Sequence, residues 1–300
     1  MEYNCYLKYR LGISTLVALF TLIIPIVAIA QTDPVFKPIS ADIIKIPSKV
    51  LGEERKIYIY VPTADSLQPD KHYPVLYVLD GDNHFSLVAE YCRYLSRKDV
   101  NVVPEMIIVG IPNTNRTRDL TPTNSITDYE GKPDTSSNPR YKLSGGGNNF
   151  LQFIGTELIP YIDANYKTQS FKIFAGHSFG GITTINCLLT RPDMFDAYVA
   201  ISPSFWWDKR YLLKLADEKL KNLQALHKMV FYSDANEGMS GGKSFFHDDV
   251  VKFDAILNHS KIIGLDNKYV CYPEDTHMTE PIKAYYDALR FIFIHTGVDH

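Results

Sequence analysis

Residues 171–190 read FKIFAGHSFGGITTINCLLT, and this stretch decides the fold. The short apolar run 171–175 is typical of a buried strand, and residues 179–190 are typical of a helix. Between them lies the pattern G-x-S-x-G, centred on Ser178. A sharp strand-to-helix turn needs small residues two positions before and after the serine, because the backbone there is strained and crowded. The stretch therefore predicts a turn that raises the Ser178 hydroxyl above the edge of a sheet.

Strand and helix patterns alternate on both sides of this turn. Antiparallel-looking strands followed by repeated strand–helix units favour a single three-layer α/β/α sandwich around a mostly parallel sheet. In such sheets the chemistry gathers on loops at the carboxyl ends of the strands. The other predicted strands are 56–61, 74–79, 106–111, 197–201, 229–233 and 268–272, and the other predicted helices are 84–98, 149–165, 209–226, 243–258 and 281–295.

The position of His277 favours it as the base that a nucleophilic serine requires. A serine at its ordinary pKa needs a histidine to take its proton. His277 follows the last predicted strand and precedes the last predicted helix, where the base belongs in the chain order serine, acid, histidine. His177 adjoins the serine, but we expect its side chain to point elsewhere. His84 is expected near the same face, and the remaining histidines are read as surface or helix-end residues.

Two acidic residues follow the strand 229–233 and are candidates for the third member of the site. Asp234 comes directly off the strand, whereas Glu237 reaches further toward a histidine on the next loop. We prefer Glu237; the other carboxylate would then stabilise a turn. Asp248 and Asp249, on a predicted helix, are distant alternatives.

Backbone N–H groups at two turns are candidate donors for an oxyanion hole. The Phe179 N–H lies at the start of the helix behind Ser178, where N–H groups are free and the helix dipole is positive. Gly81 follows the strand 74–79 and would let the backbone approach a tetrahedral intermediate. The alternative for Gly81 is a plain turn.

Aromatic and basic residues near the same edge are candidates for substrate binding. Trp206 and Trp207 follow the strand 197–201 and would form either an aromatic wall or a hydrophobic plug. Arg116 and Arg118 would bind an anionic group of the substrate, or instead tie down their own loop through Asp119 or Asp128. That loop, 112–147, is long enough to be either functional or disordered.

The first thirty residues resemble a secretory signal. Lys8 and Arg10 precede an uncharged apolar run, 11–30, which ends in A-x-A at Ala30. A membrane anchor is the alternative, but Pro25 and the A-x-A ending favour cleavage after Ala30. We therefore expect an exported protein, periplasmic or secreted, that has one domain over residues 31–300 and no membrane contact after cleavage.

Composition excludes several other classes of protein. The chain is 45% hydrophobic and 22% charged, which is typical of a globular protein and not of a disordered one. Its formal net charge of −3 lacks the excess of positive charge that is typical of proteins that bind nucleic acid. Cys92, Cys187 and Cys271 remain after cleavage, too few and too scattered for a disulfide framework or a cysteine metal knot. Cys187 and Cys271 are expected to be buried, although one disulfide stays open.

Four motifs lie along the mature chain: YVLDGD at 77–82, IPN at 111–113 with RTRDLTP at 116–122, GHSFGG at 176–181 and SPS at 202–204. Together they resemble the esterase D-like family of α/β hydrolases, nearest to its enterobactin- and bacillibactin-type siderophore esterases. The resemblance implies the α/β-hydrolase fold, Ser178 as nucleophile, His277 as base, and oxyanion donors from Phe179 and from Gly81 or Asp82. The acid position is less regular in the family, which leaves Glu237 open.

The expected function is that of a serine carboxylesterase acting on a small-molecule ester through an acyl-enzyme. The mechanism requires no metal and no organic cofactor. A siderophore ester or another aryl or acyl ester would suit the site. Three alternatives remain at this point: an acyltransferase on the same fold, a feruloyl or acetyl esterase acting on polysaccharide, and a binding protein without catalysis. The sequence leaves the oligomeric state open.

Overall fold

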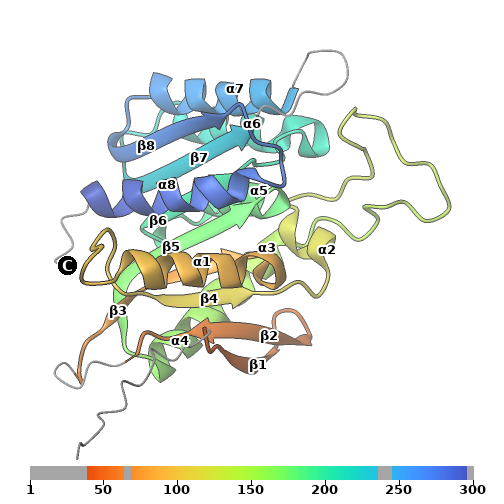
Figure 1. The fold of residues 1–300 in the computed structure, drawn as a ribbon. Coiled ribbons are helices and arrows are strands. Elements are labelled where there is room, and N and C mark those ends of the chain that lie inside the picture. The colour runs from red at the N-terminus through yellow and green to blue at the C-terminus, as the bar shows by residue number, and fades with distance from the viewer. Residues whose placement is uncertain (1–38, 64–68, 236–244, 296–300) are drawn as a thin grey trace, which may run out of the picture. The chain divides into compact units, whose positions relative to one another are not determined.

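The computed structural model describes residues 39–63, 69–235 and 245–295, and these residues belong to one compact unit. Eight strands form one sheet in the order β1-β2-β4-β3-β5-β6-β7-β8, as Figure 1 shows. The strands are β1 Asp42–Ser48, β2 Glu53–Tyr60, β3 Tyr73–Leu79, β4 Ile107–Ile111, β5 Thr168–His177, β6 Ala197–Ile201, β7 Ala225–Ala235 and β8 Ile263–Tyr272.

The sheet is mostly parallel, as the sequence predicts. Strands β3 to β8 pair in parallel, while β2 runs antiparallel to β4 and β1 antiparallel to β2. β3 has neighbours on both sides, β4 and β5, so the chain order changes direction there. In open α/β sheets, ligands bind outside the carboxyl ends of the strands near such a switch point.

Helices cover both faces of the sheet, which gives three layers. α1 (Gly81–Leu95) and α8 (Glu280–His295) lie on one face and enclose one hydrophobic core. The helical elements behind the sheet in Figure 1 enclose the other core. They are α3 Gly147–Phe153, the π-helical turn Ile154–Leu158, α4 Ile159–Asn165, α5 Phe179–Thr190, α6 Trp207–Leu220 and α7 Phe245–His259. Every residue of β3 is buried, because helices pack against both faces of the sheet there.

Three elements differ from the sequence-based expectation. β1, which was not predicted, pairs with β2 at the edge of the sheet. It contains Pro47, and an edge strand tolerates a proline that weakens the sequence signal for a strand. The helix predicted for 209–226 ends at Leu220, because Ala225 already pairs with Ile263 in the β7–β8 ladder. The long connection 112–147 contains a short helix, α2 (Arg116–Leu120).

The three described cysteines are free thiols. Cys92 and Cys187 are buried, as expected for Cys187. The expectation of a buried thiol is wrong for Cys271, which is partly exposed near the end of β8. The expected signal sequence, residues 1–30, lies outside the described residues. Among the described helices, none has both the length and the apolar character needed to span a bilayer.

Candidate active site

Ser178 occupies a strained turn between β5 and α5. Its backbone has φ 62° and ψ −114°, a conformation that L-residues rarely adopt. The Ser178 N–H donates to the carbonyl of Ile201 at 2.9 Å, which fixes the turn to the end of β6. A Cβ atom on Gly176 would lie 2.4 Å from the carbonyl carbon of Gly180. A glycine is therefore required by space at Gly176, as the sequence predicts.

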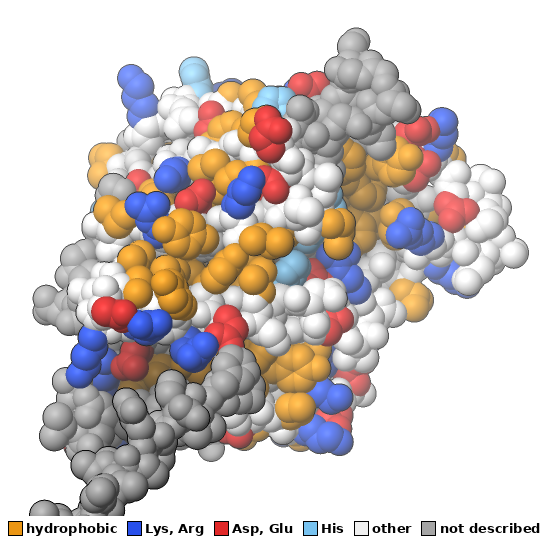
Figure 2. Space-filling view, viewed as in Figure 1, with side chains coloured by type: hydrophobic (Ala, Val, Ile, Leu, Met, Phe, Trp, Pro, Cys, Tyr) orange, Lys and Arg blue, Asp and Glu red, His pale blue; other side chains and the backbone are white. Residues whose placement is uncertain are grey.

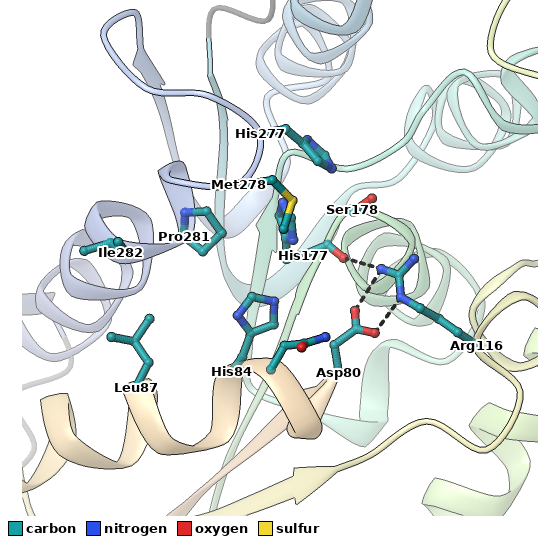
Figure 3. Close-up of a pocket in the computed structure, with 11 residues that line it drawn as sticks. Asp80, His84, Leu87, Arg116, His177, Ser178, His277, Met278, Pro281 and Ile282 are labelled. Carbon is teal, nitrogen blue, oxygen red and sulfur yellow. Dashed lines mark hydrogen bonds and ion pairs between the residues drawn. The ribbon is translucent and has the colours of Figure 1, made fainter.

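A pocket of about 480 Å³ opens beside Ser178 at the carboxyl edge of the sheet. Figure 3 shows its side chains, which come from the loop after β3, from α1, from α2, from the turn at Ser178, from the segment that leads into α8 and from the first turn of α8. The lining residues are Asp80, Asn83, His84, Leu87, Arg116, His177, Ser178, His277, Met278, Pro281 and Ile282.

His277 and Ser178 line the same pocket although 99 positions separate them in the chain. His277 lies in the segment between β8 and α8, and Figure 3 shows its ring beside the Ser178 side chain. The ring also lies 4.4 Å from that of His177, centre to centre. The structure thus brings together the serine and the histidine that the sequence analysis pairs.

His177 lies in the pocket, so the expectation that its side chain points elsewhere is wrong. Its ring lies between those of His277 and His84, with centres 4.4 Å and 5.4 Å away. Burial, together with the neighbouring His277 and His84, holds the pKa of His177 well below its ordinary value. Its imidazole is therefore neutral near pH 7. The pKa of His84 is lowered too, mainly by burial.

Ser204 is a neighbour of Ser178 that sequence reasoning missed. Its hydroxyl oxygen lies 3.2 Å from that of Ser178, and its backbone N–H donates to the Ser178 carbonyl at 3.2 Å. It follows β6, whose carboxyl end lies next to that of β5. The available signal was its position after a strand on the catalytic edge, together with the SPS motif.

Two helix N-termini meet beside Ser178 and carry the candidate oxyanion donors. Gly81 and Asp82 begin α1, and Phe179 begins α5. N–H groups in a first helical turn have no partner within the helix, so they are available to a ligand. The two turns are close, because a Cβ atom on Gly180 would lie 3.3 Å from the Asp80 carboxylate. A Cβ atom on Gly81 itself would lie 2.7 Å from the Ile111 nitrogen, so only glycine fits.

The two arginines of α2 differ in position. Arg116 lines the pocket and grips the buried carboxylate of Asp80 with two bonds, of 2.6 Å and 2.9 Å. Its guanidinium also lies 5.2 Å from the centre of the Phe179 ring. Arg118 lies outside the lining of this pocket and binds Glu53 and Asp119, each at 2.6 Å. These ion pairs support the alternative interpretation, in which Arg118 ties down its loop, and a substrate contact of Arg118 stays a prediction.

The tryptophans form a packed aromatic cluster behind Ser178, and neither lines the described pocket. Trp207 is buried, and its indole N–H donates to the Thr123 carbonyl at 3.2 Å. Trp206 is partly exposed and packs against Tyr141 and Phe179. The plug interpretation therefore holds for Trp207.

The preferred acid, Glu237, lies outside the described residues. Asp234 is described, and its carboxylate is occupied by two other groups: the Tyr269 hydroxyl donates to it at 2.5 Å, and His247 bonds to it at 2.7 Å. Of the distant alternatives, Asp249 is buried and pairs with Arg210 at 2.6 Å.

Sequence reasoning missed a second buried carboxylate, Glu280, at the start of α8. It is fully buried and accepts hydrogen bonds from the hydroxyls of Ser202 and Ser233. Burial raises its pKa to about 7, which the two hydroxyls and the nearby His277 oppose. Glu280 thus joins the ends of β6 and β7 to the start of α8, three residues after His277.

The fold and the arrangement at its carboxyl edge define an α/β hydrolase. The mostly parallel sheet, the strained serine between β5 and α5, and the histidine after β8 have the order and placement of that class. Residues 48–238 match the family model described as "Putative esterase", and the chain belongs to this family.

Curated relatives of the chain include two siderophore esterases. Ferri-bacillibactin esterase BesA of Bacillus subtilis (strain 168) is 34% identical over 177 residues, which are 55% of this chain and 60% of the relative. Siderophore enterobactin esterase of Emericella nidulans is 34% identical over 148 residues, which are 46% of this chain and 48% of the relative. The chain therefore spans about half the length of the curated relatives that it matches.

Solved structures match over a larger share of the chain. An IroE-like serine hydrolase from Shewanella oneidensis has a TM-score of 0.80 and 33% identity, and the match covers 87% of this chain and 82% of that one. Siderophore hydrolase EstB from Aspergillus nidulans has a TM-score of 0.68 at 18% identity, covering 87% and 97% of the two chains. The second likeness is one of fold alone.

Proposed function

We propose that this chain is a serine carboxylesterase that cleaves its substrate through an acyl-enzyme. The observation that carries the proposal is the strained Ser178 in one pocket with His277. Ser178 Oγ would attack the ester carbonyl while His277 takes its proton and later returns it to the leaving alcohol. Water would then attack the acyl-enzyme with His277 again as base, releasing the acid and restoring the serine.

The negative oxygen of the tetrahedral intermediate would be stabilised by backbone donors. We assign this role to the N–H of Phe179 and to the N–H of Gly81 or Asp82, which begin the two helices beside Ser178. Loss of one such donor costs on the order of 3 kcal/mol of barrier in enzymes of this kind. The grip of Arg116 on Asp80 supports the arrangement by fixing the turn that precedes Gly81.

Glu237 is our candidate for the acid that orients His277. The alternative, Asp234, already accepts hydrogen bonds from Tyr269 and His247. Replacement of Glu237 by glutamine should lower kcat with little change in KM, because the acid stabilises the imidazolium and not the bound substrate. The matched variant Asp234→Asn should not reproduce this loss of kcat at an unchanged KM. Equal kinetics for Glu237→Gln and the unaltered enzyme would remove Glu237 from the site.

A siderophore ester is the substrate class that we propose. The support is the identity of the two curated relatives, which are named for ferri-bacillibactin and enterobactin. The pocket has an apolar rim formed by the exposed side chains of Met278 and Ile282. Figure 2 shows hydrophobic side chains gathered over α1 and α8 on this face. Such a rim suits an aryl group beside the scissile ester.

A substrate panel with two variants tests the proposal. We expect the enzyme to hydrolyse p-nitrophenyl esters and an enterobactin-type trilactone, and Ser178→Ala to abolish both activities. The control Ser260→Ala alters a hydroxyl at the end of α7, where it bonds only to the Ile256 carbonyl among described partners, and should be fully active. A fluorophosphonate should label Ser178 in the folded protein.

Four outcomes of that panel, extended with feruloyl esters and an added alcohol, would contradict the proposal. Full turnover by Ser178→Ala would remove Ser178 as nucleophile. An absence of fluorophosphonate labelling in folded protein would favour a binding protein without catalysis. Transfer of the acyl group to an added alcohol in preference to water would favour an acyltransferase. Turnover of feruloyl esters but not of the trilactone would move the substrate class to plant-derived esters.

Export of the protein is a further part of the proposal. The basic residues Lys8 and Arg10, the apolar run 11–30 and the A-x-A ending at Ala30 support a cleaved signal. Amino-terminal sequencing of the protein from its own cells should begin at Gln31. Recovery of chains that begin at Met1 would contradict cleavage.

A further inference from the structure

Three side chains that carry metal-binding atoms meet near the carboxyl ends of β7 and β8. Asp234 lies at the end of β7, His247 in the first turn of α7 and Cys271 near the end of β8. Asp234 Oδ2, His247 Nδ1 and Cys271 Sγ all lie within 4.8 Å of one another. None of the three lines the pocket that contains Ser178.

The register of the sheet explains why these residues meet. Asp234 and Cys271 are direct partners in the parallel β7–β8 ladder, so their side chains project from the same face. α7 covers that face, since Phe253 packs against Tyr232, which projects from β7 two residues before Asp234. The His247 side chain extends from α7 toward Asp234 and Cys271, and its Nδ1 lies 2.7 Å from Asp234 Oδ2, within hydrogen-bond distance.

We propose that Asp234, His247 and Cys271 form a binding site for a divalent cation that takes mixed oxygen, nitrogen and sulfur ligands, with Zn²⁺ the best match. Zn²⁺ accepts carboxylate, imidazole and thiolate in one tetrahedral shell, with water in the remaining position. The cation takes the place of the proton between His247 Nδ1 and Asp234, so that a neutral His247 carries its proton on Nε2, and the thiol proton of Cys271 leaves to solvent. The two anionic ligands then balance its double charge.

The distances are close to those that a tetrahedral ion requires. Zn²⁺ bond lengths imply a separation of about 3.6 Å between sulfur and nitrogen ligands and about 3.3 Å between nitrogen and oxygen ligands. Cys271 Sγ lies 4.0 Å from both Asp234 Oδ2 and His247 Nδ1, and the latter two atoms are 2.7 Å apart. Shifts of roughly half an ångström, within reach of side-chain rotations, would complete the shell.

The surroundings support an ion in two further ways. The Tyr269 hydroxyl donates to Asp234 Oδ1 at 2.5 Å, which leaves Oδ2 directed at His247 and Cys271. Outer hydrogen bonds of this kind orient ligands in known metal sites. The His247 side chain is 39% exposed and Cys271 is partly exposed, so an ion can enter from solvent. A bound ion would fasten the start of α7 to both strands.

Cobalt and zinc binding to the full chain, first treated with a chelator, test this site. We expect one equivalent of Co²⁺ to give the thiolate-to-metal charge-transfer absorption of a cysteine-bound ion, and one equivalent of Zn²⁺ to remove it. Cys271→Ser should abolish that absorption, and His247→Asn should weaken Zn²⁺ binding at least tenfold by calorimetry. The control His259→Asn alters an exposed histidine at the other end of the same helix and should bind like the unaltered chain.

A chemical measurement on the unaltered chain covers the case in which a variant fails to fold. Cys271 is the one described thiol that is not buried, so iodoacetamide should alkylate it first, and Zn²⁺ should protect it. Absence of the cobalt–thiolate absorption, or no protection of Cys271 by saturating Zn²⁺, would overturn the proposal. In that case the three residues form a hydrogen-bonded cluster only. These readouts do not depend on ester turnover, so they stand apart from the proposed esterase activity.

Discussion

The backbone around Ser178 leaves no room for a Cβ atom at Gly176. The Cβ position of Gly176 would lie 2.4 Å from both the carbonyl carbon and the oxygen of Gly180, closer than real Cβ atoms come to backbone. Neither backbone atom can move without moving the first turn of α5. The conformation of Ser178 therefore depends on the absence of a side chain at Gly176.

We predict that Gly176→Ala destabilises the protein by about 1–3 kcal/mol through overpacking. Turnover should fall roughly a hundredfold or more, because a shift of about 1 Å in the nucleophile is enough for such a loss. Urea unfolding and ester hydrolysis measure the two effects. The control Gly155→Ala places its Cβ 3.2 Å from the flexible end of Met194 and should retain turnover. Full activity of Gly176→Ala would contradict the view that steric crowding sets the conformation of the turn at Ser178.

Glu280 gives the stability of the protein a pH dependence of known sign. Burial raises its pKa from an ordinary value of 4.5 to about 7 in the folded state. Between these pH values the folded protein holds a proton that the unfolded chain has released. The free energy of unfolding therefore falls as pH rises through this window.

Replacement of Glu280 by glutamine should remove this dependence. The difference in unfolding free energy between the original chain and Glu280→Gln should fall by up to about 3 kcal/mol between pH 4.5 and pH 7. For the control Glu53→Gln the sign is opposite, because the hydrogen bond from Arg118 lowers the pKa of Glu53. The difference in unfolding free energy between the original chain and Glu53→Gln should shrink as the pH falls below 4.5. Parallel urea series measure both, and a pH-independent difference for Glu280→Gln would contradict the raised pKa.

Among the elements, α2 is held to the domain by charge. Its Asp119 is 2% exposed and accepts bonds of 2.6 Å from Arg118 and from Arg55, whose side chain on β2 is 1% exposed. Arg116, at the start of the same helix, grips Asp80. A helix of five residues has little stability of its own, so these ion pairs fix it beside the pocket.

We predict that Asp119→Ala destabilises the protein by about 3 kcal/mol, because it leaves the buried guanidinium of Arg55 with Glu53 as its one described carboxylate partner. The control Asp99→Ala breaks a pair with Arg97 in which both side chains are more than half exposed. Such a pair contributes little, so the urea midpoint should not change. Equal midpoints for the two variants would show that α2 is held by other contacts.

At the scale of the whole molecule, one sheet separates two hydrophobic cores, and the edge strand β1 completes it. Among the described strands, β1 pairs only with β2, along its full length from Asp42 to Ser48. It contributes Ile46 to the core that contains Ile57. Without β1, the edge of β2 would be open to pairing with other chains.

Two truncated chains test the extent of the folded unit. A chain that begins at Ile39 should have the same thermal midpoint as one that begins at Gln31, because residues 39–300 form a compact unit. A chain that begins at Glu53 lacks β1 and should have a lower midpoint and associate at high concentration. Calorimetry and light scattering measure these properties. A lowered midpoint for the first chain would mean that residues 31–38 contribute to the fold.

The sequence alone determined the class of fold and predicted Ser178 as the nucleophile, because both depend on local patterns. Apolar runs mark strands that are buried on both faces, and the spacing of glycines around Ser178 reports a steric requirement inside one turn. The place of His277 after the last strand followed from the chain order of the class. This reasoning missed β1, with its proline, the end of α6 and the short helix α2.

Tertiary structure alone decided which side chains meet, because register and packing join residues that are distant in the chain. No spacing in the sequence reveals that Glu280 accepts from Ser202 and Ser233. The same holds for the ion pair between Arg118 and Glu53 and for the cluster of Asp234, His247 and Cys271. Such contacts depend on three-dimensional positions that strand order and helix placement set together, so they become visible only once the sheet is assembled.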